Sequence, residues 1–181
     1  MSEIVTVEHD LVVPNVINPV GVRGHLTIEM HRAGELIHRE EVDNLITQVG
    51  DQWYAERAAG VAGAPAAITG MKLGAGSTAP AKTGAGAALV TYLANSHQAL
   101  TGTPTSALSG SSRRLTFAAT WAAGKATTAS PITEVVIVID ALADATSTAA
   151  NTIARALISG VANKQATDSL TITWTHDLLG A

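Results

Sequence analysis

Hydrophobic and polar positions alternate most regularly in the last segment of the chain, DSLTITWTHDLLGA (168–181). Leu170, Ile172 and Trp174 share one parity and threonines occupy the other, a two-residue period typical of a strand with one buried and one solvated face. An unpaired apolar strand invites pairing with another chain. We expect this strand to pair within its own sheet, with Trp174 in the core.

The same period predicts further strands. HLTIEMH alternates cleanly and is followed by a return segment after Gly34, which predicts a β-hairpin over residues 25–42 with Gly34 at a turn position of positive φ. Three more strand-like runs are RRLTFAATWAAG (113–124), ITEVVIVID (132–140) and NTIARALIS (151–159). Consecutive Val and Ile in the second of these runs indicate a strand covered on both faces, and we expect it to be the central strand.

A helical period is found in one segment, residues 44–59. Apolar side chains recur there at four-residue intervals, as Leu45, Val49 and Trp53. Asn44 is a good N-cap and Gly60 a good terminator, so the pattern predicts one principal helix.

Residues 60–112 are rich in Ala, Gly, Ser, Thr and Pro. This composition predicts long loops, with a short strand near 68–73 and a helical turn near 86–94. The predicted fold class is therefore mainly β, an antiparallel β-sandwich or flattened barrel with one principal helix and long Ala/Gly/Thr-rich loops.

Two prolines near the start of the chain, Pro14 and Pro19, each remove a backbone donor and disfavour helix before them. They predict an extended N-terminal arm over residues 1–22, which we expect to lie on a neighbouring molecule. A single β-rich domain is expected over residues 23–181.

Composition restricts the function classes. The 181 residues include no cysteine, so disulfides, thiolate metal sites and a cysteine nucleophile are excluded. The net charge of −4 without a dense Lys/Arg run argues against nucleic acid as a partner. No apolar run reaches the ~18 residues of a membrane span, and the acidic start lacks the features of a signal peptide, so we expect a soluble, unexported protein without a membrane partner.

Candidate ligand-binding residues are sparse. Gly74 and Gly76 in KLGAGS are the nearest approach to a phosphate loop, but the segment lacks the remaining motif residues and is interpreted as a turn. His31 and His38 could meet across the predicted hairpin, but a metal site would need a third ligand.

Charged residues within the predicted strands and loops are interpreted structurally. Asp140 and Asp144 match no EF-hand spacing and suit loop chemistry. Arg113 and Arg114 are expected to guard the start of an edge strand. Glu134 and Arg155 each interrupt an apolar strand and are expected to face one another as a buried pair.

No Ser, His and acid arrangement around a nucleophile elbow is recognisable. We therefore assign no catalytic, cofactor-binding or metal-binding residue, expect no cofactor, and interpret the protein as non-enzymatic.

The order of the segments resembles a family of small virion proteins of tailed bacteriophages. The resemblance covers about residues 24–178 and is carried by a polar strand pair leading to Asn-Leu and a helix, by ITGMKLGAGSTAPAKTGAGAAL, and by the final DSLTITWT. The family's usual EaGlf is replaced here by Glu134, Val135 and Val136. The resemblance implies a head-decoration, minor structural or tail-associated component.

The leading hypothesis is a capsid decoration protein that binds the shell exterior as a homo-oligomer. Its expected partners are the major capsid protein or other virion proteins, and its expected location is the virion, assembled in the host cytoplasm. The alternatives are a tail, collar or baseplate-associated protein, and a host-glycan-binding β-sandwich module for which Tyr54 and Tyr92 would be the residues to change. A cell-wall hydrolase is a further alternative.

Overall fold

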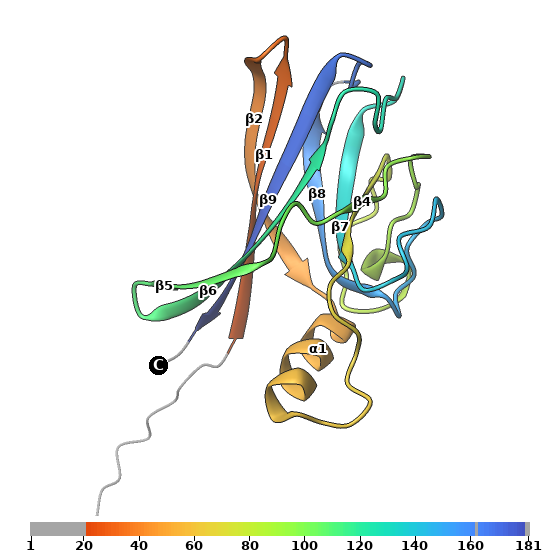
Figure 1. The fold of residues 1–181 in the computed structure, drawn as a ribbon. Coiled ribbons are helices and arrows are strands. Elements are labelled where there is room, and N and C mark those ends of the chain that lie inside the picture. Colours follow the sequence, from red (N-terminus) through yellow and green to blue (C-terminus); the bar gives the residue numbers. More distant parts are fainter. Residues whose placement is uncertain (1–20, 162, 180–181) are drawn as a thin grey trace, which may run out of the picture.

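The computed structural model describes residues 21–161 and 163–179 of the chain, with one α-helix and nine strands in that part (Figure 1). The strands are β1 (Gly21–Arg32), β2 (Glu35–Ile46), β3 (Gly70–Gly74), β4 (Gln98–Ala99), β5 (Thr105–Ser109), β6 (Ser112–Trp121), β7 (Ile132–Val138), β8 (Thr152–Val161) and β9 (Asp168–Leu179). The helix α1 is Gln48–Ala59, and a short 3-10 helix, η1, is Gly84–Ala87.

All nine strands belong to one antiparallel sheet in the order β4-β3-β7-β8-β2-β1-β9-β6-β5. The sheet curls into a half-barrel, and α1 lies at its lower end (Figure 1). The predicted fold class, mainly β and antiparallel with one principal helix, is confirmed, and the flattened-barrel alternative describes the curled single sheet.

The residues on both sides of β4 draw the two edges of the curled sheet together. The indole Nε1 of Trp121 in β6 donates to the carbonyl of Ser96, at 2.7 Å. The amide of Thr101 donates to the carbonyl of Ala118, also in β6, at 2.7 Å. The chain therefore crosses from one edge strand, β4, to the other, β5, and ties β6 to the opposite side on the way.

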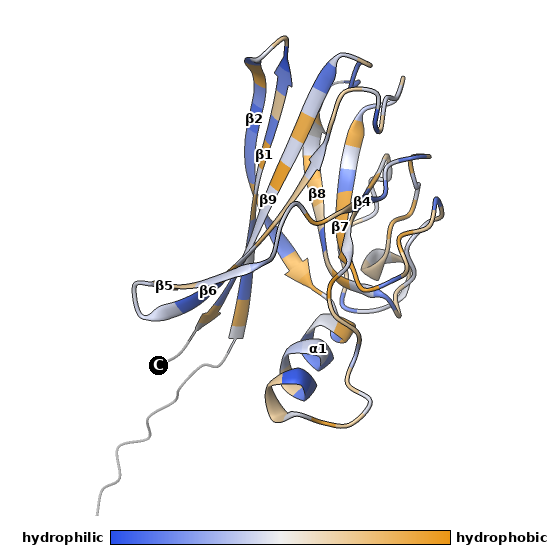
Figure 2. Ribbon diagram, in the orientation of Figure 1, coloured by the Kyte–Doolittle hydropathy of each residue, from blue (hydrophilic) through white to orange (hydrophobic). Residues whose placement is uncertain are grey.

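The last strand, β9, pairs with β1 on one side and with β6 on the other. Leu170, Ile172 and Trp174 are fully buried, and the intervening threonines are partly exposed. Figure 2 shows the corresponding alternation of hydrophobic and polar residues along β9. The prediction that this strand pairs within its own sheet, with Trp174 in the core, is confirmed.

The predicted first hairpin is also confirmed, with β1 and β2 joined by Ala33 and Gly34. Both turn residues have positive φ, 51° and 88°. Two consecutive positive φ values match the right-handed twist of the flanking strands. The hairpin is longer than predicted, because β1 begins at Gly21 and β2 continues to Ile46.

The start of the helix differs from the prediction. Asn44 lies in β2, and the N-cap of α1 is Thr47, whose Oγ1 accepts from the amide of Gly50 at 3.0 Å. The strand continues through Asn44 because its side chain is held by the sheet, as described below. Gly60 ends the helix in the left-handed conformation (φ 66°), as predicted.

A glycine is needed at position 50 of α1 because the helix packs closely against the sheet at this point. A Cβ at this position would lie 2.2 Å from the carbonyl oxygen of Ile153 in β8. The absent side chain therefore allows the first turn of α1 to pack directly on the backbone of β8.

The prediction for β7 is half right. The strand is buried on both faces, because Val135 and Ile137 join the main core while Val136 and Val138 pack with Leu89 from the loop after β3. It is not the central strand, since it is third from the β4 edge and β2 occupies the middle of the sheet. The consecutive apolar residues of β7 are therefore explained by the loop that covers its second face, and not by a central position in the sheet.

The segment 60–112 contains more structure than predicted. β3 lies near the expected strand at 68–73, and η1 replaces the helical turn expected at 86–94. β4 and β5 were predicted as loop. Residues 1–20, most of the predicted arm, lie outside the described residues, and Gly21 and Val22 belong to β1.

Candidate functional site

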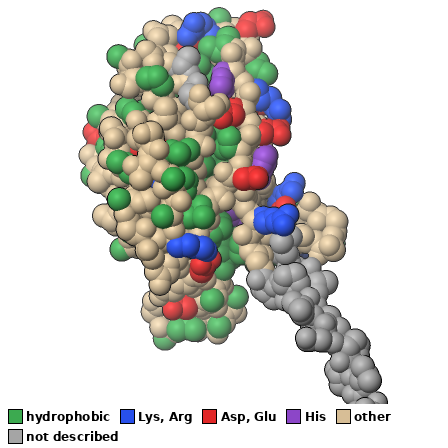
Figure 3. All heavy atoms as spheres, turned by 180° about the vertical axis from the view of Figure 1, so that it is seen from behind, with side chains coloured by type: hydrophobic (Ala, Val, Ile, Leu, Met, Phe, Trp, Pro, Cys, Tyr) green, Lys and Arg blue, Asp and Glu red, His purple; other side chains and the backbone are tan. Residues whose placement is uncertain are grey.

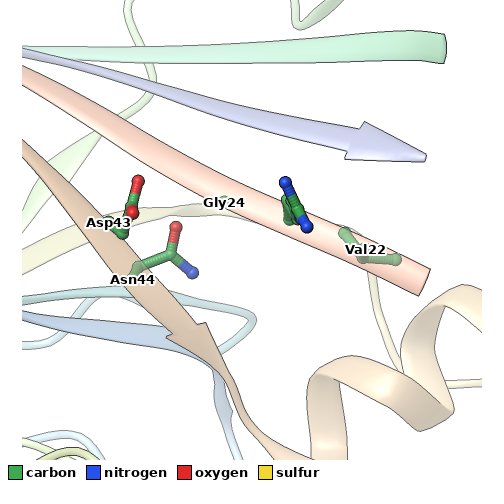
Figure 4. A pocket seen from close by; sticks show the side chains of 5 residues that line it. Val22, Gly24, Asp43 and Asn44 are labelled. Atoms are coloured by element: carbon green, nitrogen blue, oxygen red, sulfur yellow. The ribbon is translucent and has the colours of Figure 1, made fainter. Parts of the chain in front are cut away.

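A polar hollow of about 320 Å³ lies between the start of β1 and the end of β2 (Figure 4). It is lined by Val22, Arg23, Gly24, Asp43 and Asn44. Gly24 is opposite Asn44 in the strand register, and a Cβ on Gly24 would lie 1.8 Å from the Asn44 Oδ1 atom. The missing side chain of Gly24 therefore makes room for the Asn44 amide.

The Asn44 amide is oriented by the core. Its Oδ1 accepts from the indole Nε1 of Trp174 at 2.9 Å. Its buried Nδ2 has no hydrogen-bond partner among the described residues. Asp43, on the outer side of the hollow, is exposed and lies 3.1 Å from the Nδ1 of His25. The hollow is therefore polar, with the exposed side chains of Arg23 and Asp43 among its lining residues.

His176 is a buried titratable group that the sequence analysis did not single out. It is fully buried, its Nδ1 lies 2.5 Å from the hydroxyl of Tyr54 in α1, and its ring meets those of Phe117 and Trp174 edge-on. Burial lowers the pKa of His176 to about 3, and burial also raises the pKa of Tyr54. The neutral imidazole therefore fastens the helix to β9. Its parity, shared with Trp174, was the signal in the sequence.

Two apolar hollows flank α1 at the lower end of the half-barrel. One, of about 290 Å³, lies on the concave side of β5 and β6 and is lined by Trp53, Ala67, Ile68, Pro104, Thr105, Ser106, Leu115 and Phe117. The other, of about 450 Å³, is lined by Gly21, Val22, Asp51, Tyr54, Ala55, Ala58 and Leu178. The β5–β6 hairpin projects from the body at the same end (Figure 1). Two apolar hollows and a projecting hairpin therefore lie at one end of the molecule.

Glu134 and Arg155 form the buried pair that the sequence predicted. The Arg155 Nη2 atom donates to Glu134 Oε2 at 2.7 Å, and both side chains are fully buried. Glu134 also accepts from the backbone amides of Gly76, Val90 and Thr91. The carboxylate therefore holds the loop after β3 against the sheet, which is a structural role.

Gly74 and Gly76 of KLGAGS lie directly beside the Glu134 carboxylate. A Cβ on Gly74 or on Gly76 would lie 2.4 or 2.5 Å from Glu134 Oε1. These glycines let the backbone approach Glu134 closely, so the arrangement gives no sign of phosphate binding. Lys72, beside them, is buried and donates to Asp140 Oδ2 at 2.7 Å.

The predicted histidine pair is not brought together. The register shifts between Met30 and His31, so His38 is opposite Met30 and His31 is opposite Leu36. His31 and His38 consequently lie on opposite faces of the hairpin. No group of three potential metal ligands occurs in the part of the chain that the structure describes.

The predicted aspartates organise loops separately from one another. Asp140 pairs with Lys72, as noted above, while Asp144 accepts from the hydroxyl of Tyr92 at 2.8 Å and from the amide of Asn95 at 2.6 Å. Tyr92 and Tyr54 therefore both use their hydroxyls inside the protein. This gives no support to either ring as a platform for a glycan.

The arginine prediction is corrected in one respect. Arg113 and Arg114 lie at the start of β6, but β6 is covered by β5, which is the edge strand. Arg114 forms a bidentate pair with Asp177 in β9, with both distances 2.7 Å, and Arg113 Nε donates to Ser106 in β5 at 2.8 Å. The two side chains therefore join strands.

Charged side chains gather elsewhere, on the β1–β2 hairpin. Arg39 pairs with Glu29 and with Glu41, and His25 lies near Asp43. Seen from behind, charged and histidine side chains follow one side of the molecule, while hydrophobic side chains are scattered over the rest (Figure 3). The opposite charges largely compensate each other, so this side is polar without a strong field of one sign.

Comparisons of the chain with protein families, with curated proteins and with solved structures found no match. Among the described helices, none is long and apolar enough to cross a membrane.

Proposed function

We propose that the protein is a non-enzymatic structural component of a tailed-bacteriophage virion, a capsid decoration protein that binds the exterior of the shell. The phage context is supported by the segment order described above. The carrying observation is the concentration of apolar hollows and a projecting hairpin at one end of the half-barrel (Figure 1). Such surface suits contact with another protein.

The rest of the structure is consistent with a protein that folds before it meets its partner. Its core is closed by buried pairs such as Glu134 with Arg155 and Tyr54 with His176. The partner would then be bound by preformed surface, and many symmetry-related copies would add weak contacts together on a shell.

The first experiment measures location and copy number. Purified virions are analysed by quantitative mass spectrometry against the major capsid protein, and the particle is imaged by electron cryomicroscopy. A copy number comparable to that of the shell subunit supports decoration. A handful of copies at the tail favours the tail-associated alternative, and absence from washed virions contradicts the proposal.

The second experiment tests the hollow beside α1. Ala58 lines this hollow and is exposed, whereas Ala59 is exposed on the same helix but does not line it. A glutamate in the hollow would have to be desolvated on binding, so Ala58→Glu is expected to weaken binding to empty shells by about tenfold or more. The matched variant Ala59→Glu is expected to bind like the unchanged protein. Equal binding by both variants would exclude this hollow from the contact.

A further inference from the structure

The edge strand β5 is unusual because it lacks the features that normally block pairing with another chain. It carries the five residues TSALS, with no charge, no proline and no bulge in its pairing with β6. Natural edge strands are usually protected by such features. Leu108 in this strand is 77 % exposed, the highest exposure among the large hydrophobic residues that the structure describes as exposed.

The backbone groups that face outward follow from the turn. A two-residue turn, Gly110 and Ser111, joins β5 to β6, and Ser109 is opposite Ser112. The pair that closes such a hairpin exchanges hydrogen bonds, and the pattern then alternates along the strands. Ser106 and Leu108 are therefore the residues whose amide and carbonyl groups point to the free edge.

We propose that β5 pairs antiparallel with β5 of a second copy of the chain, with Ala107 on the two-fold axis. In this register Ser106 of each copy is opposite Leu108 of the other, so all the outward backbone groups of these residues are used. Shifting the axis to Ser106 would place Leu108 opposite Pro104, which has no amide hydrogen. The register centred on Ala107 avoids this loss.

Side chains favour the same register. Ser106 is opposite Leu115, and Leu108 is opposite Arg113, so Ser106 and Leu108 share the concave face with Leu115. The apolar hollow on that face is lined by Ser106, Leu115 and Phe117. Leu108 of one copy would lie beside Ser106 of the other, at the mouth of this hollow, and the two-fold axis repeats the contact.

Electrostatics and size decide how strong the pairing is. The strand has no charge, so pairing of two identical strands meets no like-charge repulsion within it. The contact is small compared with the ~1,000 Å² typical of a stable interface, so the isolated dimer should be weak. The proposal assigns a surface to the homo-oligomer expected from the sequence and does not depend on the virion location.

The register is tested by a disulfide, because the chain has no cysteine of its own. Two copies of residue 107 would form a non-hydrogen-bonded pair with Cα atoms about 4.5 Å apart, within the range of a disulfide. Ala107→Cys is therefore expected to form a covalent dimer under mild oxidation. In the matched variant Ser109→Cys, on the same strand and face, the two thiols would be about 14 Å apart along the strands and should not link.

The strength is tested by sedimentation equilibrium of the unchanged protein from about 10 μM to about 1 mM. We expect a monomer–dimer equilibrium that Leu108→Lys weakens by about tenfold or more, because a lysine on the edge opposes pairing. Leu36→Lys, at another exposed leucine, should leave it unchanged. The proposal is overturned if the unchanged protein stays monomeric over this range, or if a disulfide forms equally well at residue 109. A strand of another protein at this edge would give the first of these results.

Discussion

The guanidinium of Arg155 in β8 lies 2.7 Å from the carboxylate of Glu134 in β7, and neither side chain reaches solvent. The two residues are not directly opposite, since Val136 is opposite Arg155 and Glu134 is opposite Leu157. The long arginine side chain spans this diagonal. The pair stands at the centre of a polar cluster that includes three loop amides, and its removal should be felt beyond the two strands.

We predict that Arg155→Met lowers the free energy of unfolding by about 3–5 kcal/mol, because the Glu134 carboxylate is left buried without its counter-charge. Denaturant unfolding at neutral pH measures this loss. Adding Glu134→Gln to Arg155→Met removes the buried charge while keeping an amide oxygen for the loop, and should recover part of the stability. If the Arg155→Met variant is as stable as the unchanged protein, the ion pair does not contribute to the free energy of unfolding.

Gly24→Ala is predicted to destabilise the protein by about 1–3 kcal/mol, the usual cost of overpacking. The new Cβ would collide with the Asn44 amide, which accepts from Trp174. Gly21→Ala is the matched control on β1, because a Cβ there meets no atom within 4 Å. Thermal unfolding of both variants checks the prediction, which fails if the two are equally stable.

The His176 imidazole predicts a loss of stability in weak acid. Burial lowers its pKa from 6.5 to about 3, so the folded protein holds it neutral while the unfolded chain takes up a proton. The stabilising contribution is complete above about pH 6.5 and declines as the pH falls towards 3.

The check compares unfolding at several pH values for the unchanged protein and for the double variant Tyr54→Phe/His176→Phe, which removes both partners together. The variant should show a shallower decline in the free energy of unfolding below pH about 6.5. Identical pH dependence of the two proteins would contradict the buried neutral histidine.

Asp168 predicts a second loss of stability at lower pH. Hydrogen bonds from Arg32 are the main reason that its pKa falls from 3.8 to about 2, since the Arg32 Nε donates to Oδ1 at 2.8 Å. The folded state therefore favours the carboxylate. Its contribution is present above about pH 4 and is lost as the pH falls through about 2.

Arg32→Met should remove this contribution, giving a protein that is less stable at neutral pH and loses less on further acidification from pH 4 to 2. Arg23→Met, an exposed arginine on the same strand, is the matched control. Acid unfolding followed by circular dichroism distinguishes the two. Equal behaviour of both variants would show that Arg32 does not stabilise the Asp168 carboxylate.

The local sequence pattern was sufficient to predict those elements in which neighbouring side chains determine which face is buried. β9 and the first hairpin could be predicted because a two-residue period needs only one buried face, and Gly34 marks the turn. The Glu134 and Arg155 pair could be predicted because charged groups inside apolar strands need each other. The close approach of Gly74 and Gly76 to that pair could not, because it depends on a loop distant in sequence.

The edge strand β5 was missed because TSALS has little hydrophobic periodicity, and its strand conformation comes from pairing with β6 across the Gly110 turn. The intrinsic preference of asparagine predicts a helix cap at Asn44, but the hydrogen bond from Trp174 and the space above Gly24 keep this residue in β2. The sequence by itself determined the strand-rich class, the buried parity of β9 and the paired core charges, since these follow from neighbouring residues. Only the tertiary structure decided the strand order, the hollows beside α1 and the exposed edge, because each depends on which distant segments the curled sheet brings together.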